Sequence, residues 1–459
     1  MRAGWLQPLI AAAALLPAIS AAAAAPETAE APAAEAAPPV RVRVIERNRP
    51  TESRPDAEPD GKTEPAARPT AFDTVILENA CLRAVVVPAL GGHLIQVHDK
   101  RAGLDLLAGP ARRGGAGLRF PHPGARPPPG EGVCWRIVRD DDGTVTVAVD
   151  RRFRQFTGPR AALFSPLRMG TTVTLRPDSP VLEVTGRVDN PLPLRQGFRL
   201  WYAARLPARR GARVLLPAGA VADAALGTVR PWPGDRPVPM AEARPLGPDL
   251  WALGAAGGWV GVYEPASDTN RLLVRSRYGA PGTAVRLPAP AAGDTAVRGG
   301  SPHPPRRNER FSLPPETLEA AVGSCATAGH PGHYLPPFGA YGMRLRLAMV
   351  RGIGPVVWAD ERMAVGLWRR GGAMGLRVVG LGSPERVRLV LRADGEREEV
   401  AGRLSPDRPL AVQLRGRRAR VRLTVLDAED DELADVFLPP RAEPLGDDAL
   451  AALRGRMEP

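Results

Sequence analysis

The chain of 459 residues has a formal net charge of +13, with 44% hydrophobic and only 5% aromatic residues. This length allows two domains with a sizeable core, and three cysteines are too few for a disulfide-rich scaffold. Nearly all the basic charge is arginine, scattered along the chain and interleaved with acidic residues, so no nucleic-acid partner is predicted. A solvated mixed surface is the main interpretation, and an acidic polysaccharide, lipopolysaccharide or membrane surface is the alternative.

The N-terminus has the features of a signal peptide over residues 1–25. Arg2 precedes an apolar run at 9–16, and 21–25 offers small residues for cleavage. The run is shorter than the roughly 20 residues that a spanning helix needs, so no transmembrane segment is expected after cleavage. We therefore expect an exported protein, periplasmic or secreted. Residues 26–70 are rich in Pro, Ala, Glu and Arg and predict a disordered N-terminal tether.

Residues 78–107 read as strand, turn, strand and charged hairpin. The turn is at Gly91-Gly92, where glycine allows a positive φ, and the hairpin is at 99–103. From here to residue 360, apolar runs are short and alternate with a period of two, which predicts an all-β domain over 71–360. Examples are 145–149, 171–175, 181–188 and 213–216.

A second, smaller β-domain is expected over 361–440. About seven short alternating runs follow one another there, which is typical of an immunoglobulin-like β-sandwich. Residues 441–459 predict a short C-terminal helix and tail. Cys81, Cys134 and Cys325 allow either one disulfide with one free thiol or three buried free thiols.

Several short motifs, taken in order, resemble the galactose mutarotase-like (aldose 1-epimerase-like) superfamily. They match an uncharacterised branch, a domain of unknown function often found upstream of tetratricopeptide repeats. The chain departs from that branch at His93, which replaces Arg, at Ala203 or Ala204, which replaces Asn, and at Thr317, which replaces Tyr. The motifs are 87–94, 114–121, 187–191, 200–203, 229–233, 258–264, 318–323 and 350–355. The resemblance implies a β-supersandwich followed by the small sandwich.

The resemblance also implies a carboxylate base and a histidine acid on opposite sides of a sugar ring. Glu319 stands at the position of the base, with an exposed strand carboxylate as the alternative. His122 and His93 are the candidates for the acid, with a structural or rim histidine as the alternative. His330 and His333 are spaced like metal ligands but flank Pro331-Gly332 in a loop, so no metal is predicted. No cofactor is expected.

Aromatic and arginine side chains are the candidates for ligand binding. Flat rings pack on the C–H faces of sugars, and arginine can bind a carboxylate or sulfate through two hydrogen bonds. Because tryptophan in β-proteins is often part of the core, we expect about half of the aromatic candidates inside. The ligand-binding candidates are Arg119, Trp201, Trp232, Trp259, Tyr263 and Arg351, with Tyr202 and Tyr334 also near the expected groove.

Three functions remain open at this stage. The first is an exported carbohydrate-binding protein, including binding of an acidic glycan, whose catalytic site is lost or altered. The second is an aldose 1-epimerase-like isomerase, or another glycan-processing enzyme, that uses Glu319 with His122 or His93. The third is a cell-envelope scaffold whose groove binds a protein segment.

Overall fold

The computed structural model describes only part of the chain, and all of that part belongs to the second of two units, 1–37 and 38–459. The predicted signal peptide and C-terminal helix lie outside the described residues. Within the predicted disordered tether, 41–48 forms a strand that pairs with 72–78, so that prediction is wrong there. The described residues are 39–48, 72–108, 117–119, 133–152, 167–198, 201–223, 228–233, 236–246, 249–253, 258–276, 283–287, 317–323, 333–370, 373–382, 384–393, 396–414 and 421–438.

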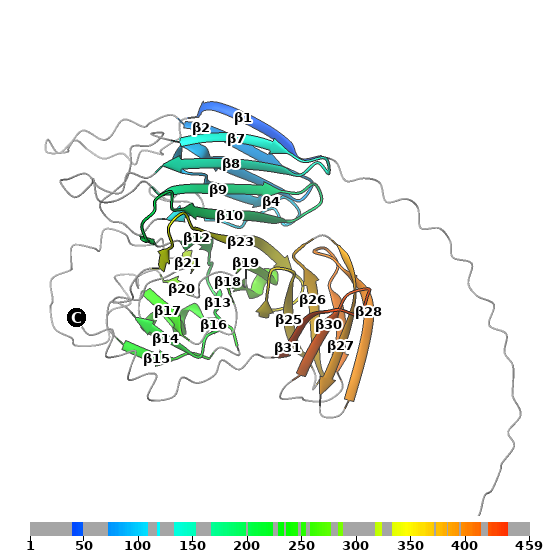
Figure 1. Ribbon diagram of the computed structural model, residues 1–459. Helices are drawn as coiled ribbons and strands as arrows, with labels where there is room; N and C mark the ends of the chain where they lie inside the picture. Colours follow the sequence, from blue (N-terminus) through cyan, green and yellow to red (C-terminus); the bar gives the residue numbers. More distant parts are fainter. Residues whose placement is uncertain are drawn as a thin grey trace, which may run out of the picture. The chain divides into compact units, whose positions relative to one another are not determined.

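Three sheets form the large β-domain (Figure 1). The five-stranded sheet contains, in spatial order, β1 (Arg41–Asn48), β2 (Phe72–Glu78), β3 (Leu82–Val87), β4 (His93–Asp99) and β5 (Leu104–Asp105). The nine-stranded sheet contains β16 (Val238–Pro239), β13 (Arg213–Leu215), β18 (Trp259–Glu264), β19 (Thr269–Arg275), β23 (Ala340–Arg351), β10 (Val181–Asp189), β9 (Arg168–Leu175), β8 (Val145–Arg152) and β7 (Val133–Arg139). The seven-stranded sheet contains β15 (Thr228–Pro231), β14 (Ala220–Asp223), β17 (Asp249–Leu253), β20 (Thr283–Arg286), β21 (Thr317–Gly323), β12 (Trp201–Pro207) and β6 (Gly117–Arg119).

Smaller elements complete this domain. A two-stranded sheet pairs β11 (Gln196–Phe198) with β22 (His333–Leu335). Helices within the described residues are short: α1 (Met240–Ala243) and the 3-10 turns η1 (Pro88–Leu90), η3 (Arg244–Leu246) and η4 (Pro265–Ser267). The all-β prediction is therefore confirmed.

Alternating side chains explain why these segments form sheets around one core. In β9 the residues alternate between buried and partly exposed, so one face packs inward and the other does not. Apolar residues from all three sheets form a single cluster, including Val86 of the five-stranded sheet, Val173 of the nine-stranded sheet and Leu318 of the seven-stranded sheet. This shared core is what places the seven-stranded sheet against the nine-stranded one.

The Gly91-Gly92 turn lies close to the nine-stranded sheet. Both glycines have φ of 80°, as the sequence predicts for this turn. A Cβ atom at Gly92 would lie 3.2 Å from Cγ2 of Thr171, in β9. Glycine at this position thus allows the five-stranded sheet to approach β9 closely.

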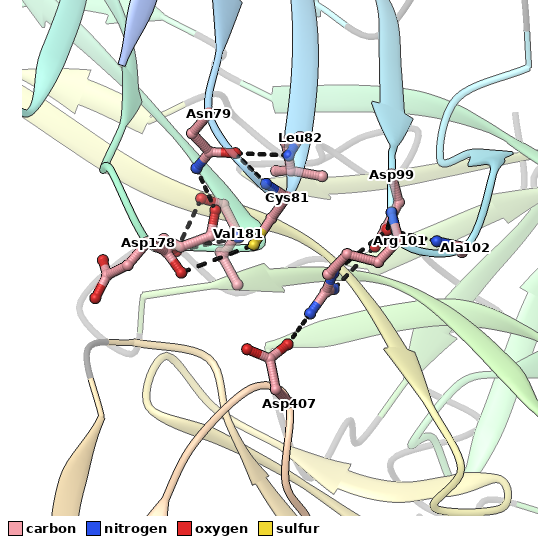
Figure 2. A network of polar contacts seen from close by, with 10 residues as sticks. Asn79, Cys81, Leu82, Asp99, Arg101, Ala102, Asp178, Val181 and Asp407 are labelled. Atoms are coloured by element: carbon pink, nitrogen blue, oxygen red, sulfur yellow. Dashed lines mark hydrogen bonds and ion pairs between the residues drawn. The ribbon is translucent and has the colours of Figure 1, made fainter. Parts of the chain in front are cut away.

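Polar contacts hold the two turns of the opening segment (Figure 2). The Asn79 side chain accepts hydrogen bonds from the backbone N–H groups of Cys81 (2.8 Å) and Leu82 (2.6 Å) and donates to the carbonyls of Arg176 and Ser179. The fully buried Asp99 carboxylate caps the following turn and pairs with Arg101 at 2.9 Å. Arg101 also pairs with Asp407. The Asn79 and Asp99 side chains therefore replace the backbone partners that the turns lack.

Two four-stranded sheets form the small sandwich. One contains β24 (Val356–Ala359), β25 (Met363–Arg370), β26 (Ala373–Gly380) and β29 (Leu410–Leu414), and the other contains β28 (Glu396–Leu404), β27 (Glu385–Ala393), β30 (Val421–Leu426) and β31 (Glu432–Leu438). All seven strands expected from the sequence are present, and β24 joins them from upstream. Leu376, Leu389 and Leu423 are among the residues of its own apolar core.

Candidate functional site

The seven-stranded sheet turns one face toward the large core and the other away from it. Tyr202, Leu206, Leu318 and Ala320 belong to the core cluster. Because successive residues of a strand face opposite sides, Glu319 lies on the outward face. The outward face is where the predicted base is found.

Glu319 forms an ion pair on this face with Arg205 of the neighbouring strand. The two residues are direct register partners of β21 and β12. Arg205 Nε lies 3.4 Å from Glu319 Oε2, and the two side chains are only 12% and 9% exposed. A carboxylate this buried needs a partner to offset the loss of hydration, and Arg205 supplies it. Glu319 is therefore not the exposed strand carboxylate that the sequence left open.

Register extends this pair into a row of four charged positions. Asp249 of β17 is opposite Arg286 of β20, Arg286 is opposite Glu319, and Glu319 is opposite Arg205. Acidic and basic residues thus alternate across four adjacent strands. Opposite charges at directly facing positions stabilise a sheet.

Apart from Trp251 at one end, small residues occupy the next row of the same face. This row crosses β17, β20, β21, β12 and β6, and its register positions are, in that order, Trp251, Ala284, Ala321, Ala203 and Gly117. Ala203 is buried yet belongs to none of the three apolar clusters. A third row begins with Gly323, Trp201 and Arg119. A band of small residues therefore separates the charged row from the Trp201 and Arg119 positions.

Three predicted site residues, Arg119, Trp201 and Glu319, consequently come together in adjacent strands of one sheet. The side chains of Arg119 and Trp201 lie outside what the structure describes, and so does all of His122. His93 is the first residue of β4, in the five-stranded sheet.

The other predicted residues lie elsewhere. Trp232 is buried, and its Nε1–H donates to the Leu216 carbonyl at 3.0 Å. Trp259 is 2% exposed and packs in an apolar cluster. Tyr263 donates its hydroxyl to Asp268 at 3.2 Å, and burial, together with the Asp268 charge, raises the pKa of Tyr263. Arg351 is exposed at the end of β23, opposite Thr269. Trp232 and Trp259 are thus core residues, in line with the expectation that about half the aromatics lie inside.

Of the two additional tyrosines, one is buried and the other is exposed. Tyr202 is buried among core residues, whereas Tyr334 is 49% exposed with the Arg195 guanidinium 4.4 Å from its ring centre. Among the aromatic candidates whose side chains are described, Tyr334 is therefore the most exposed.

Sequence reasoning missed Arg205, Arg286 and Trp251. Arg205 had a detectable signal, since it alternates with Trp201 and Ala203 along one strand. Arg286 and Trp251 depend on the pairing of β17, β20 and β21, strands that lie far apart in the sequence, and such pairing has no local signal.

Metal and disulfide chemistry find no support in the described part of the chain. No group of three or more His, Cys, Asp or Glu residues is arranged there to hold a metal ion. Cys81 is buried and free, and Cys134 is exposed and free. Among the residues described, no helix is long and apolar enough to cross a bilayer.

No family model and no curated protein matches the chain. Solved structures with a similar fold include a TPR-domain containing protein from Parabacteroides distasonis, with a TM-score of 0.46 and 17% identity over 61% of this chain and 47% of the other. A galactose mutarotase-like protein from Clostridium acetobutylicum has a TM-score of 0.41 and 11% identity over 61% of this chain and 96% of its own. One from Lactobacillus casei has a TM-score of 0.42 and 13% identity over 60% and 99%.

The chain thus matches about half the length of the Parabacteroides protein and nearly all of the two shorter ones. These two carry the superfamily name that the sequence motifs indicate, and their likeness to this chain concerns the fold alone.

Proposed function

We propose that the protein is an exported carbohydrate-binding protein whose site surrounds the Arg205–Glu319 pair, with mutarotase-type catalysis lost or altered. The observation that supports this most is the buried ion pair on the outward face of the seven-stranded sheet, 3.4 Å between Nε and Oε2. Sugar hydroxyls both donate and accept hydrogen bonds, and a guanidinium beside a carboxylate offers both kinds of partner.

The neighbouring rows suit the same ligand. Small residues stand in register at positions 203, 284 and 321, and the Trp201 position precedes Ala203 by two residues on β12. A ring that packs there would contact aromatic carbon on one side and charged donors and acceptors on the other. The register places Arg119 opposite Trp201, and an arginine at this position suits an acidic sugar.

The engagement of Glu319 supports altered catalysis. A general base must reach the proton that it removes, and one carboxylate oxygen of Glu319 is held by Arg205. We therefore favour binding over the epimerase alternative.

A glycan array with the mature chain tests the binding function. The wild-type should bind a defined set of glycans, and Glu319→Gln and Arg205→Gln should each weaken that binding at least about tenfold, the loss of one charged hydrogen bond. Glu183→Gln is the matched control, since Glu183 also pairs with arginines but lies in the nine-stranded sheet. Equal binding by wild-type and Glu319→Gln would contradict the proposed site.

Polarimetry on fresh α-glucose and α-galactose separates binding from epimerisation. We expect no acceleration over buffer. Acceleration that Glu319→Gln abolishes would instead favour the isomerase.

Export is tested separately. Sequencing the N-terminus of the protein recovered from outside the cytoplasm should begin near Pro26, and recovery of the intact N-terminus only from the cytoplasm would contradict export.

A further inference from the structure

The second sheet of the small sandwich gathers arginines on its outward face. Along β27, Val387, Leu389 and Leu391 belong to the small core, so Arg386 and Arg392 face away from it. Strands β28, β27, β30 and β31 lie side by side in that order (Figure 1). Arginine is the most frequent outward residue of these strands: three lie on β27, two on β28 and one on β30.

Register places several of these arginines directly opposite one another. Arg386 is opposite Arg403 of β28, and Arg392 is opposite both Arg397 of β28 and Arg422 of β30. Like charges at facing positions destabilise a sheet, so folding stability alone does not account for this arrangement. With Arg388, six arginines lie on this side of the sheet, which is called the arginine face below. They are Arg386, Arg388, Arg392, Arg397, Arg403 and Arg422.

Acidic residues neutralise only half of the arginine face. Arg388 pairs with Glu399 at 3.5 Å and with Asp430 at 2.6 Å. Arg397 shares Glu399, and Arg422 pairs with Asp435 at 2.5 Å. Among the described residues, no ion pair is formed by three exposed members of the face: Arg386, Arg392 and Arg403.

The arginine face extends along the strands as well as across them. Adjacent strands are about 4.8 Å apart and residues along a strand advance about 3.3 Å, so the Arg386 and Arg392 ends are roughly 20 Å apart. Phe437 of β31 is opposite Arg422, is 51% exposed, and has the Arg422 guanidinium 5.7 Å from its ring centre. An exposed ring thus lies beside the row of arginines.

We propose that the arginine face docks on an anionic lipid surface. Guanidinium groups bind lipid phosphates through paired hydrogen bonds, and an aromatic ring beside them can enter the headgroup layer. Arginines spread over three adjacent strands and along β27 fit an extended array of charges better than one acidic polymer strand, which would follow a single row. The interpretation of the arginines as scattered is thereby corrected, because register over three strands brings together residues that the sequence separates.

Vesicle co-sedimentation of the mature full chain tests this docking. The probes are vesicles of phosphatidylcholine alone and vesicles that also contain phosphatidylglycerol. We expect binding to the anionic vesicles only, weakened by added salt. Each arginine near such a surface contributes about fivefold, so R386Q/R392Q/R403Q should lose roughly 100-fold. These three side chains form no ion pair in the described structure, so the variant should fold.

The matched control changes the same net charge on the large domain. Arg168, Arg210 and Arg213 are likewise exposed and form no ion pair among the described residues. R168Q/R210Q/R213Q should retain binding within a few-fold. An equal loss of vesicle binding in both triple variants would overturn the proposal, because net charge alone would then explain the binding.

Competition with a soluble acidic polysaccharide tests the alternative that the arginine face binds an acidic polymer. We expect it to compete only weakly with the vesicles, and F437A to weaken vesicle binding several-fold. Tighter binding to the polysaccharide than to the vesicles, or equal binding to neutral and anionic vesicles, would overturn the proposal.

Discussion

Tyr202 shows that the core of the seven-stranded sheet contains an unsatisfied polar group. Its side chain is 2% exposed, and its hydroxyl has no hydrogen-bond partner within the described residues. A buried hydroxyl without a partner lowers stability by about 1–3 kcal/mol relative to a well-packed apolar atom. Burial also raises the pKa of Tyr202 well above its ordinary value, since the phenolate would lose its hydration.

Tyr202→Phe should therefore leave the protein equally stable or more stable at pH 7. The unfolded tyrosine ionises near pH 10, whereas the folded one ionises at higher pH. Its contribution is thus complete below about pH 10 and is lost as pH rises toward the folded pKa. Urea unfolding from pH 7 to 11 should show a shallower alkaline decline for Tyr202→Phe. A decline as steep as that of the wild-type would contradict the assignment.

Arg271 and Glu264 form a buried ion pair between β19 and β18. Arg271 is 1% exposed, its Nη1 lies 2.9 Å from Glu264 Oε2, and its Nε–H donates to the Asp105 carbonyl at 3.1 Å. Because Asp105 belongs to β5, this side chain also links the five-stranded sheet to the nine-stranded one. Burial of both charges makes each dependent on the other.

Arg271→Met should lower the free energy of unfolding by about 3–5 kcal/mol, since it removes the buried partner of the Glu264 carboxylate. Only the exposed Arg209 at 3.9 Å and the Ser267 hydroxyl at 3.4 Å then remain beside Glu264. The double variant Arg271→Met/Glu264→Met should recover a large part of that loss. Urea unfolding of the two variants and the wild-type measures both changes. If the double variant is less stable than the single one, the pair is not the source of the effect.

At the scale of elements, periodicity predicted the strands, whereas their long-range neighbours had no local signal. The runs at 145–149 and 171–175 became β8 and β9 because their alternation is a local property. Glu319 was located through a family motif, yet its partner Arg205 is 114 residues away. Trp232 and Trp259 show the converse, because composition cannot tell a core tryptophan from one in a groove.

The arginine face provides a prediction for one strand, β27. Arg392→Thr removes repulsion from Arg397 and Arg422 and adds a good strand former, so stability should rise by about 0.2–1 kcal/mol. The same change at Arg388 should not stabilise, because Arg388 loses its pairs with Glu399 and Asp430. Chemical denaturation compares the two variants. Equal changes in stability for the two variants would mean that repulsion between facing arginines does not explain the effect of Arg392→Thr.

At the scale of the whole molecule, one apolar cluster joins the large domain to the small sandwich. It contains Trp259 and Leu272 of the nine-stranded sheet together with Val356, Ala364 and Val379 of the small sandwich. Polar contacts add to it, since Arg346 donates to the carbonyls of Glu361 and Leu381. The sequence predicted two domains, but the residues that join them became recognisable only when the strands were placed in space.

Because this cluster needs both domains, we expect them to unfold together. Differential scanning calorimetry of the mature chain should give one transition whose van't Hoff and calorimetric enthalpies agree. Val379→Ala should lower the temperature of that single transition, since it leaves a cavity in the shared cluster. Val412→Ala, within the small core alone, is the matched control and should also act on the same transition if coupling is complete. Two separate transitions, with Val412→Ala moving only one, would show that the shared cluster does not couple the domains.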